Sequence, residues 1–317
     1  MKRLFLCAAA LLAAASAFAQ QYPSRPIRIV VPFAPGSATD IVTRIIGQSV
    51  SAAVGQSIVV DNKAGADRAI AGAEVAKAAP DGYTLLMATN SPMAVAVAMK
   101  KQPPYDPVAD FTPISDIGRY TFFLYANAAV PAKTFQELIA YAKANPGKLN
   151  YGTGNTTAIV STAQMNALAG ITMTHVPYKS EPPAVTDLVA GRVDVVWATP
   201  TTGLVHVKDG KLKALVTSLR SRSPLLPEVP TIYEAGMPQF AISSWAALYG
   251  PAKLPREVVQ RLNKEFHDAV KRSDTAAALE KQAFTVTLST PEQLATHTKE
   301  QLDLYRKLLA SIGMQPE

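Results

Sequence analysis

The chain has 317 residues, of which 48% are apolar, and its formal net charge is +7 at pH 7. This length and composition predict two domains with buried cores. The Lys and Arg residues are scattered, which argues against the clustered basic face with stacking aromatics that nucleic-acid binding usually needs. A mild positive charge favours encounter with anionic solutes, although it also serves ordinary solubility.

The first 19 residues have the pattern of a secretory signal peptide. Lys2 and Arg3 precede an uncharged apolar run at residues 4–15, and small residues lead to a cleavage site before Gln20. That run is shorter than the roughly 20 residues needed to span a bilayer. Cys7, the only cysteine, lies in this segment. We therefore expect an exported mature chain of 298 residues (317 − 19) without disulfides or thiolate metal ligands.

In the first part of the mature chain, branched apolar runs alternate with stretches of helical period. The expected elements are a strand at 27–33, a helix at 40–54, a strand at 57–62, a helix at 70–78 and a strand at 84–89. Such alternation predicts a mostly parallel sheet covered by helices.

Residues 111–127 are predicted to form a long extended segment that leaves the first sheet and enters a second. Thr134 is expected to cap the next helix, with Glu137 completing a capping box. The expected elements from there on are a helix at 135–145, a strand at 149–152, a helix at 158–169, a strand at 173–177, a helix at 184–190, strands at 193–198, 212–219 and 243–249, and helices at 255–271 and 291–311.

Two such units joined by two extended crossings predict an α/β protein with a hinged pair of lobes, each a mostly parallel sheet flanked by helices. The expected division gives residues 20–122 plus 220–317 to lobe I and residues 123–219 to lobe II. The hinge crossings are expected near 120–126 and 217–222. The ligand cleft should lie between the lobes, at the carboxyl ends of the strands.

The turn at residues 32–40 is the first candidate site. Two prolines fix it, Gly36 permits close backbone approach, and Thr39 or Asp40 is placed to cap the following helix. Unpaired amides at a helix start can bind an anion. The same pattern also fits a tight strand-to-helix connection that binds nothing, so the turn alone leaves both interpretations open.

Several short motifs, spread over the whole mature length, resemble those of the tripartite tricarboxylate transporter receptors, also called Bug or TctC-type proteins. These motifs are YPSRPIR at 22–28, VPFAPGSATD at 31–40, VVDNK at 59–63, APDGYTL at 79–85, HVPYK at 175–179, DL at 187–188 with GRVD at 191–194, PEVPT at 227–231 and EAG at 234–236.

The resemblance implies a periplasmic binding protein fold of the type II-like, Venus flytrap kind. It implies a monomeric periplasmic receptor, without cofactor or metal, that closes over a small organic acid and delivers it to the permease subunits of a tripartite tricarboxylate transporter. In the family, the turns matching residues 33–40 and 151–157 face each other across the cleft and hold a ligand carboxylate, with ordered water taking part. The expected ligand is a dicarboxylate or an aromatic carboxylate.

Some positions depart from the family pattern and place the identity of the ligand in doubt. Ser37 replaces a glycine and adds a hydroxyl group, and Glu181 follows Ser180 where glycine is usual. The Glu181 carboxylate would contact an amine or face solvent. Arg68 stands in a loop that is usually glycine-rich, where it would pair with a second ligand carboxylate or remain an exposed loop residue.

Other polar and aromatic residues could also line the ligand site or have a structural role. Thr89, Asn90 and Ser91 end the third strand, where ligands meet such sheets. Asp187 and Asp194 are expected to be structural, the alternative being contact with an amino group. Trp197, Tyr178 and Trp245 form either an aromatic wall of the site or parts of the cores. The candidate ligand-binding residues are Phe33, Ala34, Gly36, Ser37, Ala38, Thr39, Asp40, Arg68, Thr89, Asn90, Ser91, Gly154, Asn155, Thr156, Thr157, Tyr178 and Thr199.

The sequence predicts no enzyme and no catalytic residue. The four histidines lack metal-ligand spacing, and neither a nucleophile elbow nor a phosphate-binding lysine loop is present. Two other functions remain as alternatives: a ligand sensor that partners a membrane kinase, and a secreted hydrolase or isomerase on the same scaffold.

Overall fold

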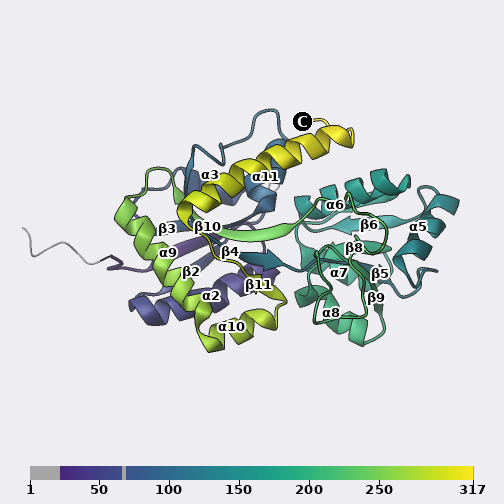
Figure 1. Cartoon of the computed structure of the whole chain (residues 1–317), viewed down its shortest axis with the longest axis horizontal. Coiled ribbons are helices and arrows are strands. Elements are labelled where there is room, and N and C mark those ends of the chain that lie inside the picture. Colours follow the sequence, from purple (N-terminus) through teal and green to yellow (C-terminus); the bar gives the residue numbers. More distant parts are fainter. Residues whose placement is uncertain (1–21, 66–68, 317) are drawn as a thin grey trace, which may run out of the picture.

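Two sheets, built from different parts of the chain, form the frame of the protein, as the computed structural model in Figure 1 shows. The structure describes residues 22–65 and 69–316. The predicted signal peptide and Arg68 lie outside these residues. Within the described ranges, no helix combines the length and apolar character needed to cross a membrane.

Lobe I contains a six-stranded sheet in the order β11-β4-β10-β3-β1-β2. β1, β2 and β3 are parallel, whereas β10 is antiparallel to both β3 and β4. Its strands are β1 (Ile27–Val31), β2 (Ile58–Asn62), β3 (Thr84–Thr89), β4 (Phe111–Tyr120), β10 (Ser244–Pro251) and β11 (Phe284–Val286). Branched side chains of β1 and β3 are fully buried, which explains why both strands are apolar runs.

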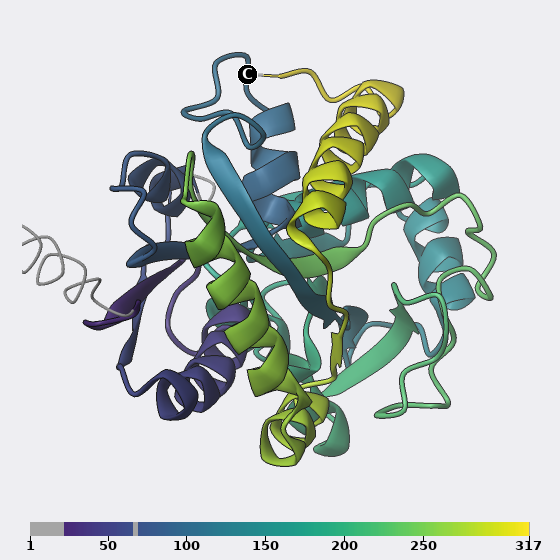
Figure 2. The ribbon, with the colours of Figure 1, turned by 60° about the vertical axis from the view of Figure 1, so that its left-hand side comes forward.

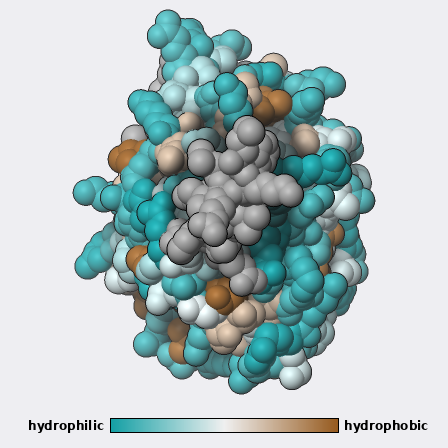
Figure 3. Space-filling view, turned by 90° about the vertical axis from the view of Figure 1, so that its left-hand side faces the viewer, coloured by the Kyte–Doolittle hydropathy of each residue, from teal (hydrophilic) through white to brown (hydrophobic). Residues whose placement is uncertain are grey.

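Helices cover both faces of this sheet. α9 packs against α2 and β4, and α11 packs against β4 and η2 (Figure 2). The helices of lobe I are α2 (Ala38–Val54), α3 (Ala69–Ala76), the π-helix η2 (Ser91–Val95), α4 (Ala96–Ala98), α9 (Arg256–Lys271), α10 (Ser273–Glu280) and α11 (Pro291–Ser311). On the end of lobe I that Figure 3 shows, hydrophilic residues prevail and the visible hydrophobic ones are mostly scattered.

Lobe II contains a five-stranded sheet in the order β7-β6-β8-β5-β9. β6 is parallel to β7 and β8, and β5 is antiparallel to β8 and β9. Its elements are β5 (Phe123–Asn127), α5 (Phe135–Ala144), β6 (Asn150–Thr153), α6 (Thr156–Ala169), β7 (Thr174–Pro177), α7 (Glu181–Val189), β8 (Val195–Ala198), α8 (Pro200–Lys208) and β9 (Leu212–Thr217).

The chain crosses between the lobes at Thr121 and Phe122, within the expected first hinge. We propose that the return crossing lies further along the chain than the expected residues 217–222. After β9, the Thr217 N–H donates to the Pro230 carbonyl oxygen and the Ile232 N–H donates to the Thr217 carbonyl oxygen. The Gln164 side chain of α6 bonds to the backbone of Gln239 and Ala241. Residues up to 242 therefore pack on lobe II, and we propose 22–122 plus 243–316 and 123–242 as the lobe boundaries.

Several short elements are absent from the sequence-based expectation. These are η2, α4, α8, α10 and β11. α8 contains Pro200, two threonines and Gly203, all poor helix formers, yet Gly203 is required there because a Cβ would lie 2.4 Å from the Tyr125 ring. Tertiary packing, rather than local propensity, stabilises this helix.

Candidate functional site

A cavity lies between the lobes, where α2 of lobe I and α6 of lobe II begin. It holds about 30 Å³, room for one or two water molecules, so a larger ligand requires the lobes to move apart before it enters. Its walls are formed by Phe33, Ser37, Ala38, Thr39, Thr89, Ser91, Tyr120, Phe122, Gly154, Asn155, Thr157, Glu181, Thr199 and Ser244.

Most of the sequence-predicted site residues meet in this wall, but some do not. Those outside the wall are Ala34, Gly36, Asp40, Asn90, Thr156 and Tyr178. The ligand-binding residues predicted from the sequence do not include Glu181, for which contact with an amine and exposure to solvent are both open, nor Tyr120, Phe122 and Ser244. The predicted hinge was a signal for the last three, because residues at a crossing between two lobes border the cleft, and β10 pairs Ser244 with Tyr120.

The start of α2 is capped differently from the expectation. Ser37, rather than Thr39 or Asp40, is the N-cap, because its hydroxyl accepts the Asp40 N–H at 3.3 Å. The Asp40 carboxylate turns back to accept the Gly36 N–H at 3.0 Å. The Gly36 amide is therefore occupied, whereas the amides of Ala38 and Thr39 have no hydrogen-bond partner among the described residues.

Asp40 has a structural role. Its side chain is 5% exposed, and it binds Arg44 Nε at 2.9 Å and Asn62 Nδ2 at 3.0 Å. Burial raises the pKa of Asp40, but the hydrogen bonds from Arg44, Gly36 and Asn62 together lower it below its ordinary value. A carboxylate with these partners holds the turn in place and is not available to a ligand.

The start of α6 provides the opposite wall. Asn155 is the N-cap, and its Oδ1 accepts the Ala158 N–H at 2.8 Å. The Thr156 amide has no partner within the described residues, and its buried hydroxyl has none either. Gly154 packs so closely on the next loop that a Cβ there would lie 2.3 Å from Glu181 N. Both helix starts line one cavity, α2 through Ala38 and Thr39 and α6 through Asn155 and Thr157, with the Thr156 amide next to the latter two in the chain. Two helix starts at one cavity are an arrangement that suits an anion.

The two lobes also touch beside the cavity. Thr157 Oγ1 lies 2.8 Å from Ser91 Oγ and accepts a hydrogen bond of 2.8 Å from Asn90 Nδ2. Asn90 is fully buried and also donates to the Tyr305 hydroxyl. The predicted strand end at 89–91 therefore forms both cavity wall and interlobe contact.

Glu181 is the charged side chain in the cavity wall. It is 7% exposed, and its Oε1 accepts hydrogen bonds from the Thr199 N–H (3.0 Å), the Thr199 hydroxyl (2.5 Å) and the Thr202 hydroxyl (2.6 Å). Burial raises the pKa of Glu181 above its ordinary value even though these hydrogen bonds lower it. Of the two alternatives at this position, the structure places the carboxylate toward the cavity and not in solvent.

The Tyr120 hydroxyl is another polar group in the wall. Tyr120 is 5% exposed, and its hydroxyl lies near Thr39 and Glu181, but none of the described residues meets it at hydrogen-bond geometry. Buried hydroxyl groups are normally hydrogen-bonded, so this group is suited to meet a ligand.

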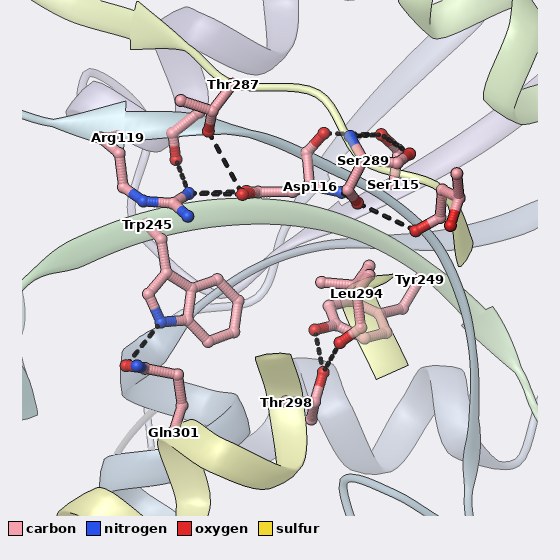
Figure 4. A network of polar contacts seen from close by, with 12 residues as sticks. Ser115, Asp116, Arg119, Trp245, Tyr249, Thr287, Ser289, Leu294, Thr298 and Gln301 are labelled. Atoms are coloured by element: carbon pink, nitrogen blue, oxygen red, sulfur yellow. Dashed lines mark hydrogen bonds and ion pairs between the residues drawn. The ribbon is translucent and has the colours of Figure 1, made fainter. Parts of the chain in front are cut away.

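Other candidates are structural. The Tyr178 hydroxyl donates to Asp187 at 2.8 Å, and Asp194 accepts the Asn150 N–H at 2.6 Å. Trp197 and Trp245 are 1% and 0% exposed and lie in the cores, so the aromatic-wall interpretation is wrong for them. Trp197 stacks on Phe240, and Trp245 donates to Gln301 at 3.2 Å (Figure 4).

A serine–histidine pair lies in lobe I, away from this cavity. Ser115 Oγ is 2.8 Å from His267 Nε2, but Ser115 is fully buried and donates to the Asp116 carbonyl oxygen. Figure 4 shows the surrounding network, in which Asp116 binds both Arg119 and Thr287. The pair joins β4 to α9, and the Ser115 hydroxyl also bonds to the Ser289 carbonyl oxygen. Ser115 is not placed to attack a substrate.

Comparison with known proteins agrees with this fold. The model of the tripartite tricarboxylate transporter family receptor, TctC, matches residues 42–314. The periplasmic binding protein BugD is 29% identical with a TM-score of 0.88, covering 93% of this chain and all of BugD. An R. palustris protein solved with adipate is 30% identical with a TM-score of 0.89, covering 94% and 100%. MatC from Rhodopseudomonas palustris, with bound malate, is 31% identical with a TM-score of 0.85, covering 91% and 100%. The predicted two-lobed α/β fold is confirmed. The expectation of mostly parallel sheets is wrong, because β10 and β11 in lobe I and β5 in lobe II pair with their neighbours in antiparallel orientation, so both sheets are mixed.

Proposed function

The chain belongs to the tripartite tricarboxylate transporter receptor family, and we propose that it is an extracytoplasmic receptor that captures a small carboxylate by closing its two lobes. The single observation that carries this proposal is the pair of helix starts, in α2 and α6, that face one interlobe cavity. Ala38 and Thr39 line this cavity, and Thr156 stands between the lining residues Asn155 and Thr157 of the other lobe. The amides of Ala38, Thr39 and Thr156 have no partner among the described residues, so they are the proposed donors from both lobes. A carboxylate held by both helix starts would favour the closed state, because it binds that state better than the open one.

The solved relatives support a carboxylate as the ligand class, since one was solved with adipate and another with malate. Isothermal titration calorimetry with a panel of carboxylic acids and a neutral sugar tests this class. We expect binding of at least one carboxylate and none of the sugar. Binding of the sugar alone would overturn the carboxylate assignment.

We further propose that the receptor works in the periplasm and delivers its ligand to the permease subunits of a tripartite transporter. The support is the family match and the signal-peptide pattern at residues 1–19. Cell fractionation with N-terminal sequencing tests the location, and a mature N-terminus at Gln20 is expected. Uptake of the bound acid by cells should require this protein together with the permease.

A sensor that partners a membrane kinase remains a second candidate for the partner. Loss of transcriptional response with intact uptake, after deletion of the protein, would favour the sensor over the transporter. No observation in the described residues favours a hydrolase. The hydrolase alternative is tested by measuring whether the protein converts any acid that it binds.

A further inference from the structure

The cavity is lined by one carboxylate, that of Glu181, as well as by the two helix starts proposed to bind an anion. The Glu181 carboxylate is more than nine-tenths buried and stands at the first turn of α7. Its Oε1 accepts three hydrogen bonds from Thr199 and Thr202. Its Oε2 accepts none from the described residues, and Glu181 is one of the residues that line the cavity.

The surroundings of Glu181 supply no balancing positive charge. None of the ion pairs formed by the described residues includes Glu181, and the cavity wall contains no Lys or Arg among them. The start of α7 is also poor in amide donors, because Pro182 and Pro183 follow Glu181 directly. A buried carboxylate that lacks a cationic partner is costly, which is why burial raises the pKa of Glu181, and a cationic group of a ligand would stabilise its ionised form.

The ligand can supply that partner if it carries both charges. Its carboxylate would meet the amides of Ala38 and Thr39, and a donor on the same ligand would meet Glu181. A simple dicarboxylate would instead place its second carboxylate near a like charge, which disfavours binding. This pattern of one anion site and one carboxylate in a single small cavity matches a zwitterion.

We propose that this receptor is selective for an amino acid, whose ammonium group donates to Glu181 Oε2 while its carboxylate binds at the helix starts. This inference rests on the proposed function, since it names the ligand class of the same cavity. It separates the chain from its relatives solved with adipate and malate, neither of which carries an ammonium group.

Calorimetry with matched pairs of acids tests the proposal. Each pair has one carbon skeleton with and without the amine: aspartate and succinate, glutamate and glutarate, alanine and propionate, phenylalanine and 3-phenylpropionate. We expect the wild type to bind the amino member of at least one pair about tenfold tighter or more, the size of effect that a hydrogen bond to a charged group produces. Tighter binding of the des-amino member in every pair that binds would overturn the proposal.

The variant Glu181→Gln keeps the size of the side chain and removes its charge. We expect it to lose the preference for the amino member while des-amino acids still bind. Glu234→Gln, at an exposed carboxylate paired with Arg222 outside the cavity, serves as the control and should keep the wild-type preference. An unchanged preference in Glu181→Gln would overturn the proposal, and the wild-type comparison decides the matter if that variant does not fold. If the wild type binds no acid of either kind, the proposed function itself fails.

Discussion

Asn90 Nδ2 lies 2.8 Å from Thr157 Oγ1, so a direct hydrogen bond joins lobe I to lobe II at the edge of the ligand cavity. The contact is extended on both sides. Ser91 Oγ lies 2.8 Å from the same Thr157 oxygen, and Asn90 also donates to Tyr305 of α11, whose hydroxyl donates to the Ser243 carbonyl oxygen at the return crossing. The closed arrangement is thus stabilised by groups that also border the ligand site.

The first prediction concerns this interlobe contact. Thr157→Val keeps the side-chain shape but removes the oxygen that accepts from Asn90, which leaves a buried donor group with one partner fewer. We expect the free energy of unfolding to fall by about 1–2 kcal/mol. We also expect the ligand-free protein to become more open, with a larger radius of gyration in small-angle X-ray scattering.

Thr162→Val is the matched control. Thr162 lies in the same helix at 2% exposure, but its hydroxyl bonds only to the Ala158 carbonyl oxygen within α6. It should leave the radius of gyration unchanged. If both variants scatter like the wild type, the contact does not hold the lobes together.

The second prediction concerns Gly36, whose φ is +79°. A Cβ at this position would meet open space, and the Gly36 amide is already bonded to Asp40. The position therefore resists substitution through backbone strain and not through blocked ligand approach. Gly36→Ala should lower the free energy of unfolding by about 1–2 kcal/mol, measured by urea denaturation. An unfolding free energy equal to that of the wild type would contradict this.

The third prediction concerns Gly154. Substitution at this position is opposed by a steric clash with a neighbouring backbone, and not by backbone strain as at Gly36. An added Cβ would lie 2.3 Å from the Glu181 backbone nitrogen, so Gly154→Ala must displace the start of α7 and with it the cavity wall. We expect a loss of ligand affinity of about tenfold or more and a destabilisation of about 1–3 kcal/mol. Wild-type affinity in calorimetry would show that this loop does not shape the site.

The fourth prediction concerns pH. Burial, with a smaller contribution from Arg119, lowers the pKa of His297 to about 4. The unfolded chain therefore takes up a proton at this group near pH 6.5, well before the folded protein does. The contribution of neutral His297 to the free energy of unfolding is therefore fully present above about pH 6.5, and it is lost as the pH falls toward 4.

His297→Gln removes this titration. The slope of the melting temperature against pH between about 6.5 and 4 should be smaller for the variant than for the wild type. Parallel curves over that range would contradict the assignment.

The sequence predicted the long, locally encoded elements well. β3 (Thr84–Thr89) and α11 (Pro291–Ser311) have the expected bounds, because period and flanking turn residues determine both. The N-cap of α5 was also predicted, since Thr134 Oγ1 accepts the Glu137 N–H; the Glu137 carboxylate, however, accepts the Lys133 N–H.

What the sequence could not provide depends on contacts between distant segments. Ser37 and Asp40 both fit a helix start, and only the Gly36 and Asn62 contacts show which one caps it. The path of residues 218–242 over lobe II depends on Gln164, which is far away in the sequence. Similarly, Glu181 could be noted as unusual, but its burial against Thr199 follows from the packing of α7 beside α8.

A ligand carboxylate is proposed to bind between the starts of α2 and α6. A high-resolution crystal structure with the ligand that co-purifies, or with the tightest acid found by calorimetry, is the decisive measurement. We expect carboxylate oxygens within hydrogen-bond distance of the Ala38 or Thr39 amide and of the Thr156 amide, directly or through one water molecule. A ligand bound with its carboxylate away from both helix starts would contradict it.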